Sequence, residues 1–379
     1  MTGPEEPLPP ELSPRRQAAE LGGVPMAGGR VPRGTGRPGR GAGRRRWPRI
    51  VLTVLCTVAL LLVATAAGTY LWADRELVKV DAVTDYRGRP SAGPGTNWLL
   101  VGSDSRAGLT PQQERELHVG SDQGTNTDTV MVLHKGANGP VLMSIPRDSY
   151  VPIPAYTDSR GVAHAASKDK INAAYAAGGP QLLVRTVELD TGIRIDHYTE
   201  VGFTGVVSIV NALGGVPVCL SQPVVDSRSG ADLKAGCQTL NGTRALQLVR
   251  TRYSLPDSDL GRIRNQQQFM KSLADQVLRP GTLLDPFTLY PFLNACLASL
   301  TVDRGTGPWT LAQFGLQMYK VSGPGGKSVT VPLATANYTT PGGASAVLWS
   351  GSGSATLFGE IQNDRPVTTP TNPSGTVGS

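Results

Sequence analysis

The segment NWLLVGSDSR (residues 97–106) is the strongest indication of the fold. Its first seven residues form a short, mainly apolar run, and charged residues follow that run. Such a run is typical of a buried strand. Two similar runs follow, TVMVLHK at 129–135 and PVLMSI at 140–145, and the Asn138-Gly139 pair between them favours a hairpin turn. The three runs predict neighbouring strands of one sheet.

Further strands and helices alternate along the rest of the chain. The pattern predicts strands at 197–203, 216–220 and 328–333. It predicts helices at 171–178, 181–190, 204–215, 260–278, 286–299, 309–319 and 355–361. This mixture predicts the fold class α/β, as a single three-layer α/β/α domain with a central mixed sheet over residues 95–364. Residues 365–379, rich in Thr, Pro, Ser and Gly, predict a disordered tail.

Residues 50–72, IVLTVLCTVALLLVATAAGTYLW, form an uncharged stretch of 23 residues. About 20 apolar residues suffice to span a bilayer. Arginines precede the stretch, so the positive-inside rule places the N-terminus in the cytoplasm and the domain outside the cell membrane. A cleaved signal peptide is the alternative, but the stretch is too long and starts too late. The sequence therefore predicts a single-pass transmembrane signal-anchor helix, followed by a linker over residues 73–94.

The net charge of +7 is concentrated in the N-terminal segment. Residues 1–49 contain ten Arg, no Lys and four Glu, which gives +6 for that segment. A basic segment can bind nucleic acid, but no aromatic residue interleaves with these arginines before Trp47. We therefore interpret residues 1–49 as a disordered basic cytoplasmic tail that sets the topology and attracts anionic membrane lipid, with no nucleic-acid partner.

Several common catalytic sites are excluded by the sequence. The four histidines are scattered and do not have the spacing of a zinc site. No G-x-S-x-G nucleophile motif is present. The segment GPGGKS (323–328) lacks the first glycine of a phosphate loop and precedes a predicted strand, so we expect a surface turn there.

Charged residues stand at the ends of the three predicted strands. Asp104 and Arg106 follow the first strand, Asp128 precedes the second, and Arg147-Asp148 follows the third. Each charge alone could be a solvated loop residue or a cap. Because ligands of α/β sheets bind at strand ends, and neighbouring strands bring their ends into one crevice, the group together favours a binding site.

A second polar group lies further along the chain. Arg250 and Arg252 are two residues apart and share a face if the backbone there is extended. Asp259, Arg262 and Gln266 follow at spacings of three and four, which predicts one polar stripe on a helix. An exposed helix face is the alternative interpretation.

The two groups together suit phosphate chemistry. Guanidinium groups bind phosphate oxygens in pairs, whereas arginines crowded together without an anion repel one another. Aspartates beside a phosphate commonly hold Mg²⁺. Arginines with Mg²⁺ are the equipment of phosphoryl transfer, in which positioning and charge stabilisation do most of the catalysis. Because nucleotides are scarce outside the membrane, a polyprenyl phosphate or pyrophosphate lipid is the expected donor.

Cys219 and Cys237 flank a loop rich in Gly, Ser and Asp. In an oxidising exterior the two thiols can pair as a disulfide. Two buried free thiols are the alternative.

Seven motifs, in this order and with approximately this spacing, resemble the LytR–CpsA–Psr family of cell-envelope glycopolymer–peptidoglycan phosphotransferases. They are NWLLVGSDSR (97–106), TDTVM (127–131), SIPRD (144–148), KINAAYAAGGP (170–180), ALGGV (212–216), LNGTRALQLVRTR (240–252) and DLGRIRNQQ (259–267). The resemblance covers the exported domain from about residue 95 to at least about residue 275. The apolar span before it and the two cysteines also fit.

The resemblance implies an enzyme that moves a glycopolymer with one phosphate from a polyprenyl-pyrophosphate lipid onto peptidoglycan and releases polyprenyl phosphate. It implies Mg²⁺ (or Mn²⁺) held by Asp104 and Asp128, with Asp104 also helping to deprotonate the acceptor. Arg106 and Asp259 join these two as catalytic-site residues. The implied pyrophosphate and headgroup contacts are Arg147, Arg250, Arg252, Arg262 and Gln266.

Two positions depart from the family pattern. Asn126 and Asn265 stand where many members carry arginine, so each removes one potential phosphate contact. The apolar helix 204–213 is a candidate lining of a lipid slot, and ordinary core packing is the alternative. Its apolar residues are Val206, Val207, Ile209, Val210 and Leu213.

Three other functions remain open at this point. A pyrophosphatase would use the same site with water as the acceptor. A non-catalytic lipid-binding protein would need the arginines but not both aspartates. A transcriptional attenuator disagrees with the predicted topology, and the sequence does not identify which glycopolymer is carried.

Overall fold

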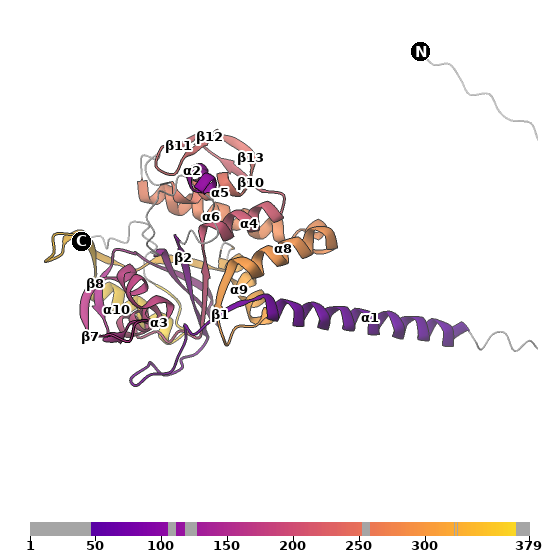
Figure 1. Ribbon diagram of the computed structural model, residues 1–379, viewed down its shortest axis with the longest axis horizontal. Coiled ribbons are helices and arrows are strands. Elements are labelled where there is room, and N and C mark those ends of the chain that lie inside the picture. The colour runs from indigo at the N-terminus through magenta and orange to yellow at the C-terminus, as the bar shows by residue number, and fades with distance from the viewer. Residues whose placement is uncertain are drawn as a thin grey trace, which may run out of the picture. The chain divides into compact units, whose positions relative to one another are not determined.

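The structure is a computed structural model that describes residues 47–104, 111–117, 127–251, 258–321, 323 and 325–368 (Figure 1). The side chains of residues 258–267 are outside the description. The chain divides into two compact units, residues 1–61 and 62–379.

Helix α1 (Trp47–Glu76) contains the predicted membrane span. It is the one helix in the described part of the chain that is long and apolar enough to cross a bilayer, and no residue in its most apolar part is buried. The helix runs four residues beyond the predicted end at Trp72. Ala73, at the start of its last turn, is buried, so this end of the helix packs against other residues of the chain. Residues 62–76 of this helix belong to the second unit.

A seven-stranded mixed sheet forms the centre of the second unit, in the order β1–β14–β9–β2–β3–β4–β15. These strands are β1 (Val78–Val80), β14 (Leu300–Asp303), β9 (His197–Val201), β2 (Thr96–Ser103), β3 (Thr127–Gly136), β4 (Gly139–Ile145) and β15 (Lys327–Thr330). The β2–β3 and β3–β4 pairs are antiparallel, whereas β2–β9 and β4–β15 are parallel. The predicted mixed sheet is therefore confirmed.

Helices cover both faces of the sheet. Alternate strand residues such as Leu99 and Val132 pack with α3 (Ile171–Thr191) and α10 (Gly351–Gln362) in the largest core cluster. Their neighbours Trp98 and Leu133 face the other way and pack against α9 (Pro308–Val321). Because successive strand side chains point to opposite faces, two fully apolar faces require two helical layers. The three-layer prediction is confirmed.

Helix α3 contains the break that the sequence predicts between residues 178 and 181. Gly179 has a φ of 64° and a ψ of −158°, and Pro180 follows it. A positive φ of this kind is open to glycine at little cost, and proline cannot donate the next helical hydrogen bond. The two predicted helices are thus arms of one bent element.

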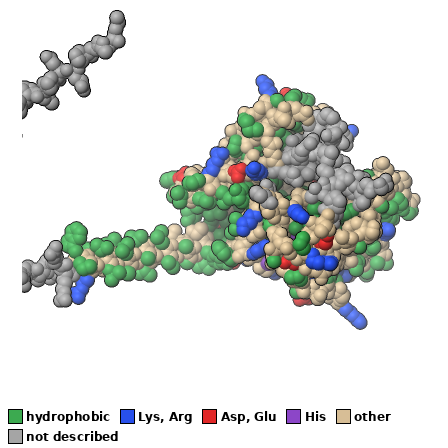
Figure 2. Space-filling model, turned by 180° about the vertical axis from the view of Figure 1, so that it is seen from behind, with side chains coloured by type: hydrophobic (Ala, Val, Ile, Leu, Met, Phe, Trp, Pro, Cys, Tyr) green, Lys and Arg blue, Asp and Glu red, His purple; other side chains and the backbone are tan. Residues whose placement is uncertain are grey.

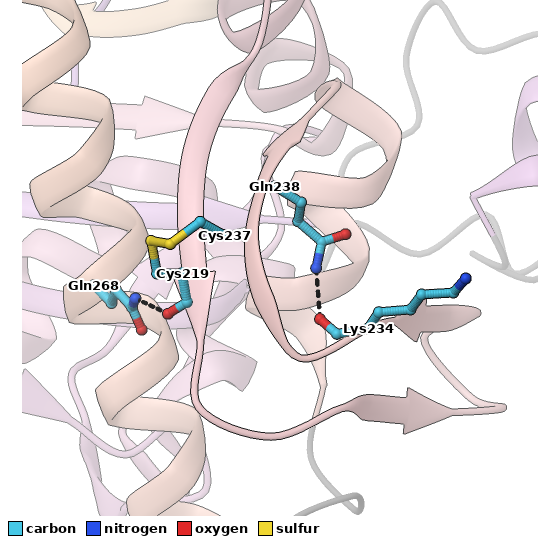
Figure 3. The surroundings of a disulfide bond; sticks show 5 residues. All are labelled: Cys219, Lys234, Cys237, Gln238 and Gln268. Carbon is cyan, nitrogen blue, oxygen red and sulfur yellow. Dashed lines mark hydrogen bonds between the residues drawn. A yellow bond between two sulfur atoms is a disulfide. The ribbon is translucent and has the colours of Figure 1, made fainter.

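A second packing cluster is built on a disulfide-linked ribbon. Its apolar residues come from α4 (Phe203–Ala212), β10 (Val216–Leu220), β11 (Val224–Asp226), β12 (Ala231–Leu233), β13 (Gly236–Leu240), α5 (Gly242–Arg250) and α6 (Ser258–Val277). Helices α7 (Pro280–Leu283) and α8 (Pro286–Ser299) follow α6 along the chain. Cys219 lies directly opposite Cys237 in the antiparallel β10–β13 pair, and the two form a disulfide (Figure 3). Of the two alternatives for these cysteines, the disulfide holds.

The remaining elements are short. They are α2 (Pro111–Glu116) and the antiparallel pairs β5 (Tyr150–Ile153) with β8 (Ser167–Lys170), β6 (Tyr156–Thr157) with β7 (Ala163–His164), and β16 (Leu333–Thr339) with β17 (Ser345–Trp349).

Parts of the predicted linker and of the predicted disordered tail pack against the domain. Residues 78–80, within the predicted linker, form β1, and Ala82 lies in the main core. Residues 365–368 were expected in the free tail, yet Val367 is buried and its carbonyl accepts a hydrogen bond from Lys327 Nζ. Single apolar residues in polar surroundings give no periodic signal in the sequence. Their burial depends on partners distant in sequence, so the sequence pattern does not predict it.

Candidate functional site

Three of the predicted site residues lie at one edge of the central sheet. Asp104 directly follows β2, Asp128 is the second residue of β3, and Arg147 comes two residues after β4. Strands β2 and β4 end at this edge, and antiparallel β3 begins there. The strand topology therefore brings three carboxylate and guanidinium groups together, as the sequence pattern predicts.

Asp128 occupies a β-bulge. Gly102 pairs with Thr129 and Ser103 pairs with Thr127, so Asp128 is the extra residue between two ladder positions. A Cβ at Gly102 would lie 3.0 Å from the Cβ of Thr129, which is why glycine suits this close approach. Bulges re-aim a side chain and are common beside active sites.

Arg147 is held between two carboxylates. Its guanidinium pairs with Asp128, and its Nε lies 3.4 Å from Asp148 Oδ2. The other oxygen of Asp148 is 3.0 Å from Lys170 Nζ, at the start of α3. About a third of the Arg147 side chain is exposed. The guanidinium is thus oriented by two carboxylates, and the side chain as a whole is partly accessible to solvent.

Arg250 reaches the same edge from the end of α5. Its guanidinium stacks over the ring of Phe203 at 4.9 Å and donates a 2.7 Å hydrogen bond to the carbonyl of Leu117. Phe203 is the first residue of α4, which begins two residues after β9 ends. Because β9 runs parallel to β2, the start of α4 lies at the strand-end edge that carries Asp104.

Glu200 is a residue of this edge that the sequence analysis missed. Its carboxylate accepts hydrogen bonds of 2.6 Å from Tyr175 and 2.7 Å from Tyr198. Burial, together with this carboxylate, raises the pKa of both phenols well above their usual range. The charge of Asp104 also raises the pKa of Tyr175, which places Asp104 near this cluster.

A cavity of about 530 Å³ opens beside Glu200, between α4 and α8. Its lining includes Ser103 from β2, Gly205 and Ser208 from α4, and Asn294 from α8. The apolar residues expected to line a lipid slot mostly face elsewhere. Val206 and Val207 pack against Leu117 and Leu246, so core packing accounts for them, and the cavity side of α4 carries small and polar residues instead.

The two aspartates form a donor set that suits Mg²⁺. Among the described residues, no group of three or more His, Cys, Asp or Glu side chains could hold a metal ion. Mg²⁺ nevertheless binds proteins through one or two carboxylates, with substrate phosphates and waters completing its shell. Ser103 Oγ and Thr127 Oγ1, each next in sequence to one of the aspartates, are buried without a hydrogen-bond partner in the described part of the chain. Two further oxygen atoms without a hydrogen-bond partner therefore lie next in sequence to the two aspartates.

Other predicted site residues lie wholly or partly outside the described part of the chain. Arg106, Arg252 and Asn126 lie outside the described residues. Asp259, Arg262, Asn265 and Gln266 lie on the backbone of α6, as predicted, but their side chains are outside the description. Their roles stay predictions.

The disulfide-linked ribbon supports α6 directly downstream of these positions. Gln268 Nε2 of α6 donates a hydrogen bond to the carbonyl of Cys219, next to the disulfide (Figure 3). Phe269 packs into the apolar cluster of the ribbon with Val218 and Leu240. Helix α6 is therefore attached to a cross-linked support at Gln268 and Phe269.

Comparison with known proteins gives consistent results. The model of the LytR_cpsA_psr family matches residues 68–346. The probable cell wall biosynthesis protein LcpB of Corynebacterium glutamicum is 41% identical over 295 residues, which cover 77% of this chain and 66% of LcpB. The cell wall biosynthesis protein LcpA of the same organism is 36% identical over 281 residues, which cover 68% of this chain and 54% of LcpA. The chain thus spans less than two thirds of either curated relative.

Solved structures share the fold. A LytR-Csp2A-Psr enzyme from Actinomyces oris superposes with a TM-score of 0.54 at 20% identity, covering 79% of this chain and 97% of that one. B. subtilis TagV gives a TM-score of 0.53 at 20% identity, with coverages of 73% and 100%. TagT bound to LI-WTA gives 0.50 at 24% identity, with coverages of 75% and 100%.

Proposed function

The chain belongs to the LytR_cpsA_psr family, and from this premise we propose that it is a membrane-anchored phosphotransferase of cell-wall assembly. Its donor is a glycopolymer linked to a polyprenyl-pyrophosphate lipid, and its acceptor is a hydroxyl of peptidoglycan. The relatives named for cell wall biosynthesis and the fold shared with TagT, which is bound to LI-WTA, support this substrate class.

The observation that carries the proposal is the meeting of Asp104, Asp128 and Arg147 at one strand-end edge, with Arg250 beside them. Two carboxylates and two guanidinium groups match a pyrophosphate and a divalent cation. A protein that only stored lipid would have no need for the paired aspartates. Their presence therefore supports chemistry over simple binding.

The proposed step is an exchange at phosphorus. The acceptor hydroxyl oxygen forms a bond to the phosphorus on the glycan side of the pyrophosphate, and the bond from that phosphorus to the bridging oxygen breaks. Polyprenyl phosphate leaves with the bridging oxygen and its electron pair. The hydroxyl proton passes to a carboxylate, a role that we assign to Asp104, or to water.

The protein groups have separate tasks in this step. Arg147 and Arg250 bind the pyrophosphate oxygens and offset the charge that develops on them. Asp104 and Asp128 would hold Mg²⁺ (or Mn²⁺), which when bound supplies further charge neutralisation. The side chain of Arg147 is positioned for this by Asp148, and that of Arg250 by Phe203.

The membrane arrangement follows from α1. We propose that this helix spans the membrane once, with the N-terminal tail in the cytoplasm and the catalytic domain outside, where lipid-linked polymer and peptidoglycan are found.

The test uses the full-length chain in detergent, because residues 73–82 pack with the domain and cannot be cut away safely. The chain is incubated with a polyprenyl-pyrophosphate glycan, Mg²⁺ and a peptidoglycan fragment, and the products are identified by mass. A glycan–phosphate–peptidoglycan adduct that disappears with a chelator supports the proposal. Free glycan phosphate without an adduct identifies a pyrophosphatase, and co-purified lipid without turnover of several glycans identifies a binding protein.

A matched pair of variants sharpens the test. Asp128→Asn removes one proposed metal ligand at the site. Asp81→Asn removes an aspartate that pairs with Arg304 beyond the ends of β1 and β14, at the opposite edge of the sheet. The proposal requires loss of the adduct with the first variant and an unchanged yield with the second.

A further inference from the structure

One end of the domain exposes large apolar side chains around α7, α8 and the start of α9. Leu284 is 82% exposed and Phe287 is 89% exposed, and Trp309 at the start of α9 is 67% exposed. Leu283 and Tyr290 are also exposed. We call these five residues the apolar rim. Soluble surfaces rarely gather such side chains without a binding partner.

The apolar rim is poor in charge. The segment from Pro286 to Ser299 contains no Asp, Glu, Lys or Arg. Asp285 is used as the N-cap of α8, where its carboxylate accepts a 3.1 Å hydrogen bond from the amide of Phe287. Phe287 and Tyr290 are three residues apart on α8 and therefore lie on one side of it. An uncharged, aromatic helix face suits a lipid interface better than water.

The rim is continuous with the membrane helix. Thr69 Oγ1 of α1 lies 2.8 Å from the Tyr290 hydroxyl, and the ring of Trp72 is 6.0 Å from the Tyr290 ring. Figure 1 shows α8 beside the C-terminal end of α1, and Figure 2 shows hydrophobic side chains gathered on the side of the domain where α1 joins it. Tyr290 therefore contacts a part of α1 that the sequence assigns to the membrane span.

Distances along α1 fix the depth of this contact. Thr69 is three residues before Trp72, the last residue of the apolar stretch, which corresponds to about 4.5 Å along the helix axis. Asp74 and Arg75 follow within one turn and mark the beginning of the aqueous phase. Tyr290 is thus at the level of the lipid headgroups or slightly below it, where tyrosine and tryptophan are enriched in membrane proteins.

From these contacts we propose that the apolar rim docks the domain onto the outer leaflet of the membrane that α1 crosses. Phe287, Leu284 and Trp309 enter the boundary between headgroups and acyl chains, which is the depth reached by interfacial helices. The domain is then held by two attachments, the span and the rim. This inference needs α1 to span the membrane but is independent of the proposed chemistry.

A second attachment has a consequence for the site. The cavity between α4 and α8 is lined in part by Asn294 and Ala298, which lie on the same helix as Phe287. Docking α8 on the bilayer therefore holds this cavity at a constant distance from the membrane surface. A lipid-linked pyrophosphate would then reach the strand ends without leaving the membrane surface.

The experiment measures the lipid contact of single labelled sites in the full chain. Free cysteines are removed by Cys56→Ala and Cys296→Ala, and the Cys219–Cys237 disulfide is kept. An environment-sensitive NBD fluorophore is attached at Phe287→Cys or Trp309→Cys. The chain is reconstituted into vesicles of phosphatidylcholine and phosphatidylglycerol that carry acyl-chain spin labels, which quench the fluorophore on contact.

Two matched sites calibrate the signal. Leu62→Cys, on the exposed apolar surface of α1, reports full contact with acyl chains, and Val225→Cys, at the exposed middle position of β11, reports water. We expect the rim labels to be quenched on the order of half as strongly as the Leu62 label, because side chains at the interface reach only the outer part of the acyl chains. The Val225 label should not be quenched.

Two outcomes would overturn the proposal. Rim labels that behave like the Val225 label, while the Leu62 label is quenched, would mean that the domain does not touch the leaflet. Rim labels shielded from water but insensitive to the lipid spin label would mean that protein, such as a second copy of the chain, covers the rim. Because no substrate is present, neither result depends on whether the chain is a phosphotransferase.

Discussion

The hydroxyl of Tyr175 donates a 2.6 Å hydrogen bond to Glu200, and this bond joins helix α3 to the strand end beside the candidate site. Tyr198 donates to the other oxygen of the same carboxylate, at 2.7 Å. Because burial raises the pKa of both phenols well above their usual range, they remain hydrogen-bond donors at any physiological pH. Glu200 is therefore a fixed acceptor held close to Asp104.

We predict that Glu200→Gln impairs transfer while the fold is retained. An amide offers one oxygen to two phenols, so one of the two hydrogen bonds to a charged acceptor is lost, at a cost of about 1.5–3 kcal/mol. If the transition state at Asp104 is destabilised by a similar free energy, the rate of adduct formation falls about tenfold or more. The rate and the free energy of unfolding should be measured together. Tyr198→Phe, which removes one donor and leaves the carboxylate, should have the smaller effect on the rate.

The participation of Glu200 is not evident from the sequence, for a physical reason. In HYTEVGF the glutamate lies between a threonine and a valine on a predicted strand, and a charged residue there is also typical of a solvent-facing position. Only the parallel pairing of β9 with β2 brings it beside Asp104. Asp104, Asp128 and Arg147 were predictable because each flanks one end of an apolar run, and strand ends are a local signal. The short strand β1 and buried Val367 depend on distant partners and leave no such signal.

Arg147 should be indispensable for transfer but dispensable for folding. We predict that Arg147→Ala lowers adduct formation about 100-fold or more, because a partly exposed guanidinium with charge-assisted hydrogen bonds to phosphate is lost. Single-turnover kinetics with the lipid-linked donor would measure the loss. Arg304→Ala is the matched control, since Arg304 also pairs with an aspartate but lies beyond the end of β14, at the opposite edge of the sheet. Normal turnover by a folded Arg147→Ala variant would refute the assignment of Arg147 to the phosphate site.

The disulfide should stabilise the support of α6. Cys219 and Cys237 are separated by 18 residues, and closing a loop of that size stabilises a protein by about 3 kcal/mol in the chain-entropy description. We predict that the Cys219→Ser/Cys237→Ser double variant loses approximately this free energy of unfolding in urea titrations. A reducing agent should destabilise the wild-type chain to the same extent and leave the double variant unchanged. An equal response of both chains to the reductant would contradict the prediction.

Cys296 provides the control for that experiment. Burial raises the pKa of its thiol to about 12, so the thiol is unreactive near neutral pH. Cys296→Ala should retain the full response to reductant. A response that disappears in this variant would mean that the reductant acts at α8 and not at the ribbon.

The last prediction concerns stability against pH and rests on Asp190 of α3. One oxygen of this carboxylate, Oδ2, is buried without a hydrogen-bond partner in the described part of the chain, and burial raises the pKa of Asp190 to about 7, although the charge of Lys168 acts in the opposite direction. An unfolded aspartate titrates near 3.9. Between these two values the folded state holds a proton that the unfolded state has released, so the free energy of unfolding falls as the pH rises from about 4 to about 7.

Replacing Asp190 with asparagine should remove this loss, because the amide is neutral at every pH. We expect Asp190→Asn to raise the free energy of unfolding at about pH 8 by about 1–2 kcal/mol, less than the whole pKa shift implies because the residue as a whole is only half-buried. At about pH 4 the variant and the wild type should be equally stable. Urea titrations in detergent at several pH values would measure how the free energy of unfolding depends on pH in the wild type and in the variant. Asp232→Asn, at the exposed middle position of β12, is the control for the change in net charge. Parallel pH profiles for the wild type and Asp190→Asn would show that the buried carboxylate does not limit stability at neutral pH.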